Sequence, residues 1–185
     1  AVEAEVYAMA TLFIALLFWL GLRWEQEMMT PRGNRWLLLI SLVIGLSFGV
    51  HFMALLTIPS IGFLYYFKHY KKVTIKNFII ANVVVVSILL FIFKLLLPLT
   101  MAFFGKTEVF MVNTFGLPFD SGTIFVVLLF IAFFYFGLRY TKQKGLVFYN
   151  TVILCILFIL IGFSTWMMLP IRANARLVAA TLKAG

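Results

Sequence analysis

The sequence predicts an all-α integral membrane protein with about six transmembrane segments. Hydrophobic residues make up 64% of its 185 residues and charged residues only 11%, whereas about 25% of the residues in soluble domains are charged. The mean hydropathy is +1.11, and several apolar runs reach or approach the roughly 20 residues that a bilayer-spanning helix needs. Inside a bilayer every backbone polar group must be satisfied within its own segment, so we expect these runs to be helical.

The central feature is an apolar run over 36–67, in which His51 is the only acidic or basic residue. As one straight helix this run would measure about 48 Å at roughly 1.5 Å per residue, far more than the about 30 Å of a hydrocarbon core. Gly45, Gly49 and Pro59 indicate where it breaks. We predict two short helices, over 36–50 and 55–67, that meet at a bend holding His51 and return to the side they came from.

The other expected helices follow from the remaining apolar runs, and the charges between them predict the topology. The helices are expected over 6–22, 78–97 (ending at Pro98), 123–138 and 146–169. If the chain turns back at the bend, the three basic loops, 23–35, 68–76 and 139–144, lie on one side with ten Lys and Arg residues, and the 98–122 connection on the other side has only Lys106. The positive-inside rule favours this arrangement, with both chain ends extracytoplasmic.

This topology gathers the candidate site residues at the extracytoplasmic face. Glu3 and Glu5 are candidate catalytic carboxylates, although acidic residues before a helix are also stabilised by its dipole. Tyr7 is a candidate binding residue or an interfacial tyrosine. His51 is a candidate because titratable groups at membrane depth are costly without a partner; the alternative is that it caps the bend by bonding backbone carbonyls. Arg172 could bind a phosphate through two hydrogen bonds or anchor the last helix at the interface.

The 98–122 connection is too long and too apolar for a plain loop. Its phenylalanines alternate with polar residues such as Asn113, so we predict an element that lies in the membrane interface and forms the wall or lid of a lipid groove. Asp120 or Ser121 is expected to cap the next helix.

No residue pattern by itself names a reaction. There is no phosphate-binding glycine loop and no Ser-His-Asp spacing, and no ligand lies at metal-binding spacing near His51, so a metal is not supported. Cys155 makes no disulfide within the chain and is interpreted as a packing residue.

Four ordered blocks nevertheless resemble a known family: AVEAEVYAMATLF, GLSFGVHFMALLTIPSIGFLYYFK, VNTFGLPFDSG and TWMMLPIRAN. Together they look like the bacterial multi-pass membrane family called domain of unknown function 2723, common in Bacteroidetes and related to the animal transmembrane protein O-mannosyltransferase. The resemblance covers about 1–174, which we take as one transmembrane domain, and leaves 175–185 as an unassigned tail. The chain opens directly into a membrane helix, so we expect a fragment of a longer protein.

The resemblance implies a partial bundle of the GT-C class, glycosyltransferases that use a polyprenyl-phosphate sugar at the extracytoplasmic face, here of a bacterial inner membrane. Glu3, Glu5 and Tyr7 match its E-x-E-V-Y block, His51 its G-x-x-x-G-x-H block, and Arg172 and Asn174 its I-R-x-N block. The family's acidic loop with the catalytic Asp would precede Ala1, so we do not expect this piece to be active alone.

Two functional hypotheses follow. The first is part of a glycosyltransferase that moves a sugar such as mannose from a polyprenyl-phosphate donor to Ser or Thr of an exported protein, with membrane lipids as further partners and no nucleic acid. Under it, Arg172, Tyr7 and Asn113 would bind the donor or line its groove. The second is a non-catalytic membrane subunit that packs in a larger envelope complex. A transporter is disfavoured because the polar residues gather at one face instead of mid-membrane in both halves.

Overall fold

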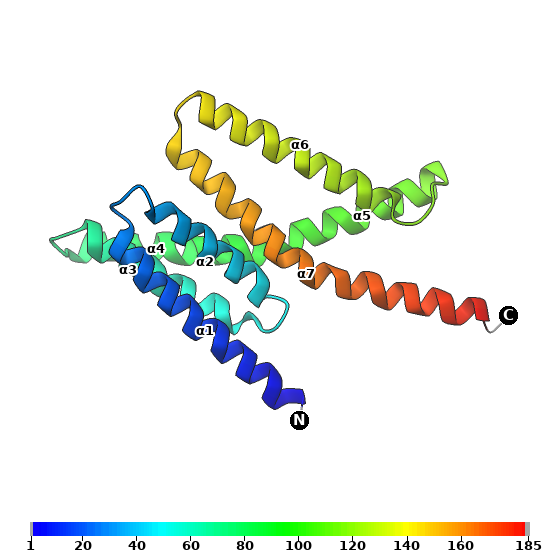
Figure 1. Ribbon diagram of the computed structural model, residues 1–185, viewed down its shortest axis with the longest axis horizontal. Coiled ribbons are helices and arrows are strands. Elements are labelled where there is room, and N and C mark those ends of the chain that lie inside the picture. The colour runs from blue at the N-terminus through cyan, green and yellow to red at the C-terminus, as the bar shows by residue number, and fades with distance from the viewer. Residues whose placement is uncertain (1, 184–185) are drawn as a thin grey trace. The chain divides into compact units, whose positions relative to one another are not determined.

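The computed structural model describes the backbone of residues 2–183 and the side chains of residues 4–166, and this part of the chain is helical without strands. Its elements are α1 (Val2–Glu27), α2 (Gly33–Ser47), the 3₁₀ helix η1 (Phe52–Leu56), α3 (Thr57–His69), α4 (Ile75–Leu90), the π-helical η2 (Phe91–Leu96), α5 (Leu97–Phe115), α6 (Ser121–Gln143) and α7 (Val147–Lys183) (Figure 1).

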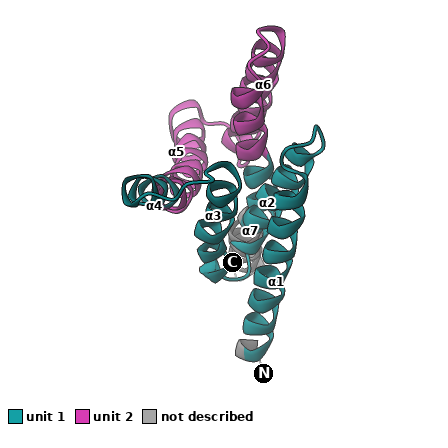
Figure 2. Cartoon of the chain, turned by 90° about the vertical axis from the view of Figure 1, so that its left-hand side faces the viewer, with its two compact units in different colours: residues 1–85, 158–185 teal, residues 86–157 magenta. Residues whose placement is uncertain are grey.

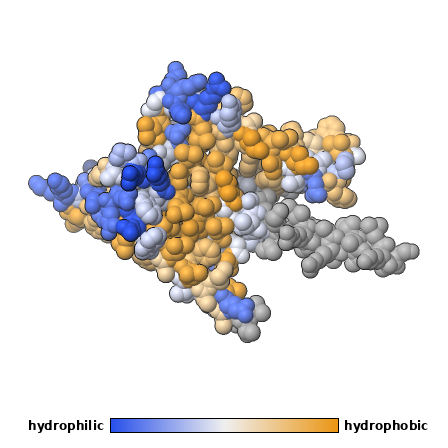
Figure 3. Space-filling view, viewed as in Figure 1, coloured by the Kyte–Doolittle hydropathy of each residue, from blue (hydrophilic) through white to orange (hydrophobic). Residues whose placement is uncertain are grey.

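Four stretches of these helices are long and apolar enough to cross a membrane, and α2 is a shorter apolar helix. The four stretches are Ala4–Glu27, Ile75–Phe115, Ser121–Gln143 and Val147–Trp166. Large apolar side chains are exposed along them, and hydrophilic residues gather mainly at the helix ends (Figure 3). A surface of this kind is stable against lipid and not against water, so the predicted all-α integral membrane class is confirmed.

The chain divides into two compact units, which are described separately (Figure 2). Unit 1 contains residues 1–85 and 158–185, and unit 2 contains residues 86–157. The boundaries fall inside α4 and α7.

Unit 1 is built on the predicted broken pair of helices. Helix α2 has 15 residues and α3 has 13, so at roughly 1.5 Å per residue each is only about 20 Å long. Between them the chain turns at 48–50 and passes through His51, whose backbone is extended with φ −162° and ψ 132°. The bend therefore lies at the predicted residue.

Contacts with α1 show that the chain returns after the bend. Near the beginning of α1, the Tyr7 ring lies 5.8 Å from the His51 ring. Near its end, Lys68 Nζ at the end of α3 lies 2.6 Å from Glu25 Oε1. Helix α2 therefore runs antiparallel to α1 and α3 runs parallel to it, which brings the first two basic loops to one end of unit 1, as the charge pattern predicted.

The glycines expected to break the run have different roles. Gly49 does lie in the turn, but Gly45 is inside α2, where a side chain would collide with the backbone of Ile159 in α7. Across this crossing, a Cβ on Gly162 would lie only 2.5 Å from the carbonyl oxygen of Leu42. Small residues allow two membrane helices to approach this closely, so Gly45 is a packing position and not a break. Pro59 is in the first turn of α3, where its missing N–H is tolerated.

In unit 2 the expected end of a helix at Pro98 is wrong. The helical stretch continues through the proline from Ile75 to Phe115. The π segment η2 ends two residues before Pro98, and the N–H of Leu97, its C-cap, bonds the Ile92 carbonyl five residues back. The wider turn accommodates a residue that lacks an N–H and would otherwise clash with the preceding turn. Much of the 98–122 connection is therefore the helix α5.

Three helices of unit 2 pack in sequence. Phe130 of α6 contacts Phe103 and Phe104 of α5 at ring distances of 6.1 and 5.7 Å. At the other end of α6, the Asn150 side-chain amide of α7 donates to the Leu138 carbonyl and to Thr141 Oγ1. In a bilayer the hydrophobic effect does not drive helices together, so side-chain hydrogen bonds of this kind contribute to their association.

Candidate functional site

The candidate site is the bend between α2 and α3. His51 is half-buried there, and its Nδ1 accepts a hydrogen bond of 3.2 Å from the Met53 backbone N–H. This bond caps η1. We expected a capping histidine to bond carbonyls, and the structure shows the opposite polarity. Because Nδ1 is the acceptor, the neutral ring carries its proton on Nε2 and can donate from that atom.

Aromatic rings hold the histidine on two sides. The Phe52 ring stacks on it at 4.8 Å, and the Tyr7 ring of α1 lies tilted at 37° with its centroid 5.8 Å away. Tyr7 is 56% exposed, so much of this residue is accessible from outside the chain. The structure thus brings together two side chains that the sequence singled out 44 positions apart.

Next to the turn at 48–50, two aromatic residues of α7 form a cluster with Phe48. Phe163 is buried and stacks on Trp166 at 5.5 Å, and Phe48 meets both rings edge-on. A Cβ on Gly49 would be 3.4 Å from Trp166 Cβ. The TWMMLPIRAN block therefore begins at the same bend as His51.

Of the other predicted site residues, the structure describes the side chains of Glu5 and Asn113. Glu5 is exposed on the first turns of α1. The side chains of Glu3, Arg172 and Asn174 lie outside the described residues. Asn113 belongs to unit 2.

Asn113 lines a shallow groove of about 480 Å³ on α5. Its walls combine apolar side chains (Val109 and Phe110) with the polar side chains of Lys106, Asn113 and Thr114. Asn113 thus lines a groove of mixed apolar and polar character, and its role in binding a lipid stays a prediction.

Helix α6 is capped by a residue of α5 that was not among the predicted caps. Neither Asp120 nor Ser121 caps the helix with its side chain: Asp120 makes no cap hydrogen bond, and the buried Ser121 hydroxyl has no partner among the described residues. Instead Glu108 of α5 accepts bonds of 2.7 Å from the backbone N–H groups of Asp120 and Thr123. Gly122 makes this possible, because a Cβ there would lie 2.5 Å from Glu108 Cα. The available signal was a lone carboxylate in an apolar helix.

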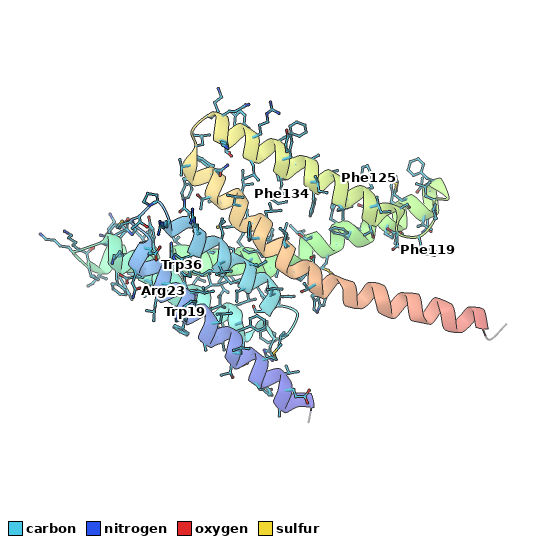
Figure 4. All side chains as sticks on the ribbon, in the orientation of Figure 1. Trp19, Arg23, Trp36, Phe119, Phe125 and Phe134 are labelled. Atoms are coloured by element: carbon cyan, nitrogen blue, oxygen red, sulfur yellow. The ribbon has the colours of Figure 1, made fainter. Side chains whose placement is uncertain are left out.

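The opposite end of unit 1 is aromatic and basic. Trp19 meets Trp36 edge-on at 6.0 Å, and the Arg23 guanidinium lies 5.7 Å from the Trp19 ring (Figure 4). Tryptophan with basic residues is typical of a membrane–water interface. Within the described residues, no group of three or more His, Cys, Asp or Glu side chains could hold a metal ion.

The fold and the bend define a class: a polytopic helical membrane protein with a histidine and a tyrosine paired at one end of its first helices. Residues 1–74 match the family model described as the N-terminal domain of the protein O-mannosyl-transferase TMEM260. The resemblance to the O-mannosyltransferase family is thus confirmed over α1, α2, α3 and the bend, and it supports a membrane glycosyltransferase kind of function. No curated protein and no solved structure matches the chain.

Proposed function

We propose that this chain is part of a glycosyltransferase that transfers a sugar from a polyprenyl-phosphate donor to Ser or Thr of exported proteins. The observation that carries the proposal is the pairing of Tyr7 with His51, 5.8 Å apart, inside the segment that matches the O-mannosyltransferase domain. Mannose is the sugar to test first, because the matched domain is named for mannose transfer.

The proposed orientation places the bend at the extracytoplasmic face of a bacterial inner membrane. Its support is the charge pattern: the loops at the far end of unit 1 contain Arg23, Arg32 and Arg35 and four lysines over 68–76. Basic loops are retained on the cytoplasmic side. The Tyr7 end would then open outward, as would both ends of the chain.

The reaction is a displacement at the anomeric carbon. The acceptor hydroxyl oxygen forms the new C–O bond, the bond to the carrier phosphate breaks with its electron pair, and the hydroxyl proton passes to a carboxylate acting as base. Glu3 and Glu5 are the candidate bases. Arg172 would bind the leaving phosphate, which suits a planar guanidinium. His51 would position donor or acceptor through Nε2–H.

The α5 groove is the proposed site for the lipid portion of the donor. Its apolar wall at Val109 and Phe110 would contact the polyprenyl chain, and Lys106 and Asn113 would lie near its polar end.

The test uses the natural gene product containing this sequence, purified in nanodiscs. We would follow transfer of labelled mannose from a polyprenyl-phosphate donor to a Ser/Thr peptide by wild type, His51→Ala and Arg172→Ala. The matched controls are His69→Ala, at the opposite end of unit 1, and Arg176→Ala. Loss of transfer in the first pair with retention in the controls would support the proposal.

Other outcomes reject parts of it. Equal activity of His51→Ala and wild type would show that His51 at the bend has no role in the transfer reaction. No transfer from any lipid-linked sugar by wild type would reject the enzyme and favour the non-catalytic membrane subunit.

A further inference from the structure

A second groove, separate from the one on α5, lies in unit 1 at the end away from the bend. This groove of about 230 Å³ runs between α3 and α4 beside the lysine-rich loop that joins them. Tyr65 and Tyr66 of α3 line it together with Tyr70, the residue that follows α3, and Asn77 and Ala81 line it from α4. The spacing of four residues places Asn77 and Ala81 on one face of α4, and it does the same for Gly62 and Tyr66 on α3.

The groove is a built feature of the helix pair. At its inner end Gly62 allows close approach, since a Cβ there would lie 2.6 Å from Val85 Cγ2. One wall is fixed from behind because Tyr65 stacks on Trp24 of α1 at 6.1 Å and on His69 at 3.9 Å. Contacts on both helices therefore define the shape of the groove.

One residue that lines the groove, Tyr66, has an unpartnered hydroxyl. Tyr66 is 4% exposed, and its hydroxyl has no hydrogen-bond partner among the described residues. Its ring is held by Tyr70, stacked at 5.1 Å, and by Phe63, met edge-on at 6.4 Å. A buried hydroxyl without a partner is costly, and an acceptor oxygen in the groove would remove that cost.

The mouth of the groove is positively charged. Lys71 and Lys72 follow Tyr70, Lys76 precedes Asn77, and the segment 70–77 has no acidic residue. Lys68 is already paired with Glu25, but these three lysines are exposed and make no described ion pair with an acidic residue. The first turn of α4 adds the partial positive charge of a helix N-terminus.

We propose that this groove binds one anionic phospholipid. Its phosphate lies at Lys71, Lys72 and Lys76, its ester region accepts a hydrogen bond from the Tyr66 hydroxyl, and the start of an acyl chain contacts Ile80 and Val84, which also line the groove. The three features match the three parts of a phospholipid in order. The apolar lining corresponds to the acyl chain, the buried Tyr66 hydroxyl to the ester region, and the basic mouth to the phosphate. The site is separate from the proposed transfer reaction and does not depend on it.

The test measures lipid affinity of the natural gene product in detergent by native mass spectrometry. The probes are phosphatidylglycerol and phosphatidylcholine with identical chains, and we expect the anionic lipid to bind more tightly. Each lysine near an anionic lipid contributes about fivefold in affinity, so K71Q/K72Q/K76Q should bind phosphatidylglycerol at least about tenfold more weakly than wild type. Tyr66→Phe should weaken it by about two- to tenfold, the range for one net hydrogen bond.

The control R139Q/K142Q/K144Q removes the same charge from the other lysine-containing loop and should leave affinity nearly unchanged. Tyr66→Phe also keeps the ring, so its thermal stability without added lipid should equal or exceed that of wild type. Equal losses in the two triple variants would show that charge alone attracts the lipid and would overturn the site. An unchanged affinity in Tyr66→Phe, or full competition by glycerol phosphate, would overturn the groove.

Discussion

Replacing Glu108 by alanine tests whether α6 begins where it does because of a side chain on α5. Both carboxylate oxygens are used: Oε1 accepts from the Asp120 N–H, and Oε2 accepts from the Thr123 N–H, each at 2.7 Å. A hydrogen bond to a charged acceptor contributes about 1.5–3 kcal/mol. Glu108 is half-buried, so we take the low end, and the two bonds together give about 3 kcal/mol for Glu108→Ala.

Hydrogen exchange of peptides covering 117–126, followed by mass spectrometry in detergent, measures this local stability. A loss of about 3 kcal/mol makes opening, and hence exchange, about a hundredfold faster. Glu108→Gln keeps one carbonyl oxygen and loses one of the two strong bonds, so its exchange should be roughly tenfold faster.

Asp120→Asn is the matched control. Asp120 is the residue that sequence rules favour as the cap, yet its side chain makes no cap hydrogen bond, and its backbone has φ 73°. Asparagine tolerates that conformation as well as aspartate does, so exchange should be unchanged. If Asp120→Asn exchanged as fast as Glu108→Ala, or if Glu108→Ala remained protected, the cap would not be Glu108.

Three further substitutions test packing and charge. Gly162→Ala should destabilise the protein by about 1–3 kcal/mol, the usual cost of overpacking, because the new methyl meets the α2 backbone; Gly105→Ala has open space around it and should instead stabilise by about 0.5–1 kcal/mol. Thermal unfolding in detergent measures both, and equal effects would contradict the close crossing. Lys68→Gln should cost no more than about 1 kcal/mol in the same assay, because its bond to Glu25 is partly exposed; a larger loss would mean that this ion pair holds α3 to α1.

The bend was predictable because length and charge both constrain it. A run of 32 apolar residues cannot span once, and lysines on the wrong side of a membrane are costly. His51 and Tyr7 were identified for the same reason, since polar groups are conspicuous in such a sequence. Their pairing was not predictable from spacing, because it depends on α1 running beside the returning chain.

Three local predictions, for Pro98, Asp120 and Gly45, were wrong because tertiary contacts override the local rules on which they rest. Pro98 normally ends a helix, but a π turn absorbed it. Asp120 normally caps a helix, but Glu108 from a neighbouring helix already occupies those N–H groups. Glycine normally weakens a helix, but Gly45 lies inside α2, where its lack of a side chain lets the backbone of α7 pack closely against it. Each outcome depends on a residue distant in sequence, which no window of neighbouring residues contains.

The contact between Gly45 and Ile159 also has a consequence for synthesis, because its two helices are made at different times. The two residues are more than a hundred positions apart, and a ribosome adds about 5–20 residues per second. The bare glycine face of α2 is therefore synthesised roughly 5–20 seconds before the helix that covers it. Within unit 1, the segment of α7 that packs against Gly45 is therefore the last part to be synthesised.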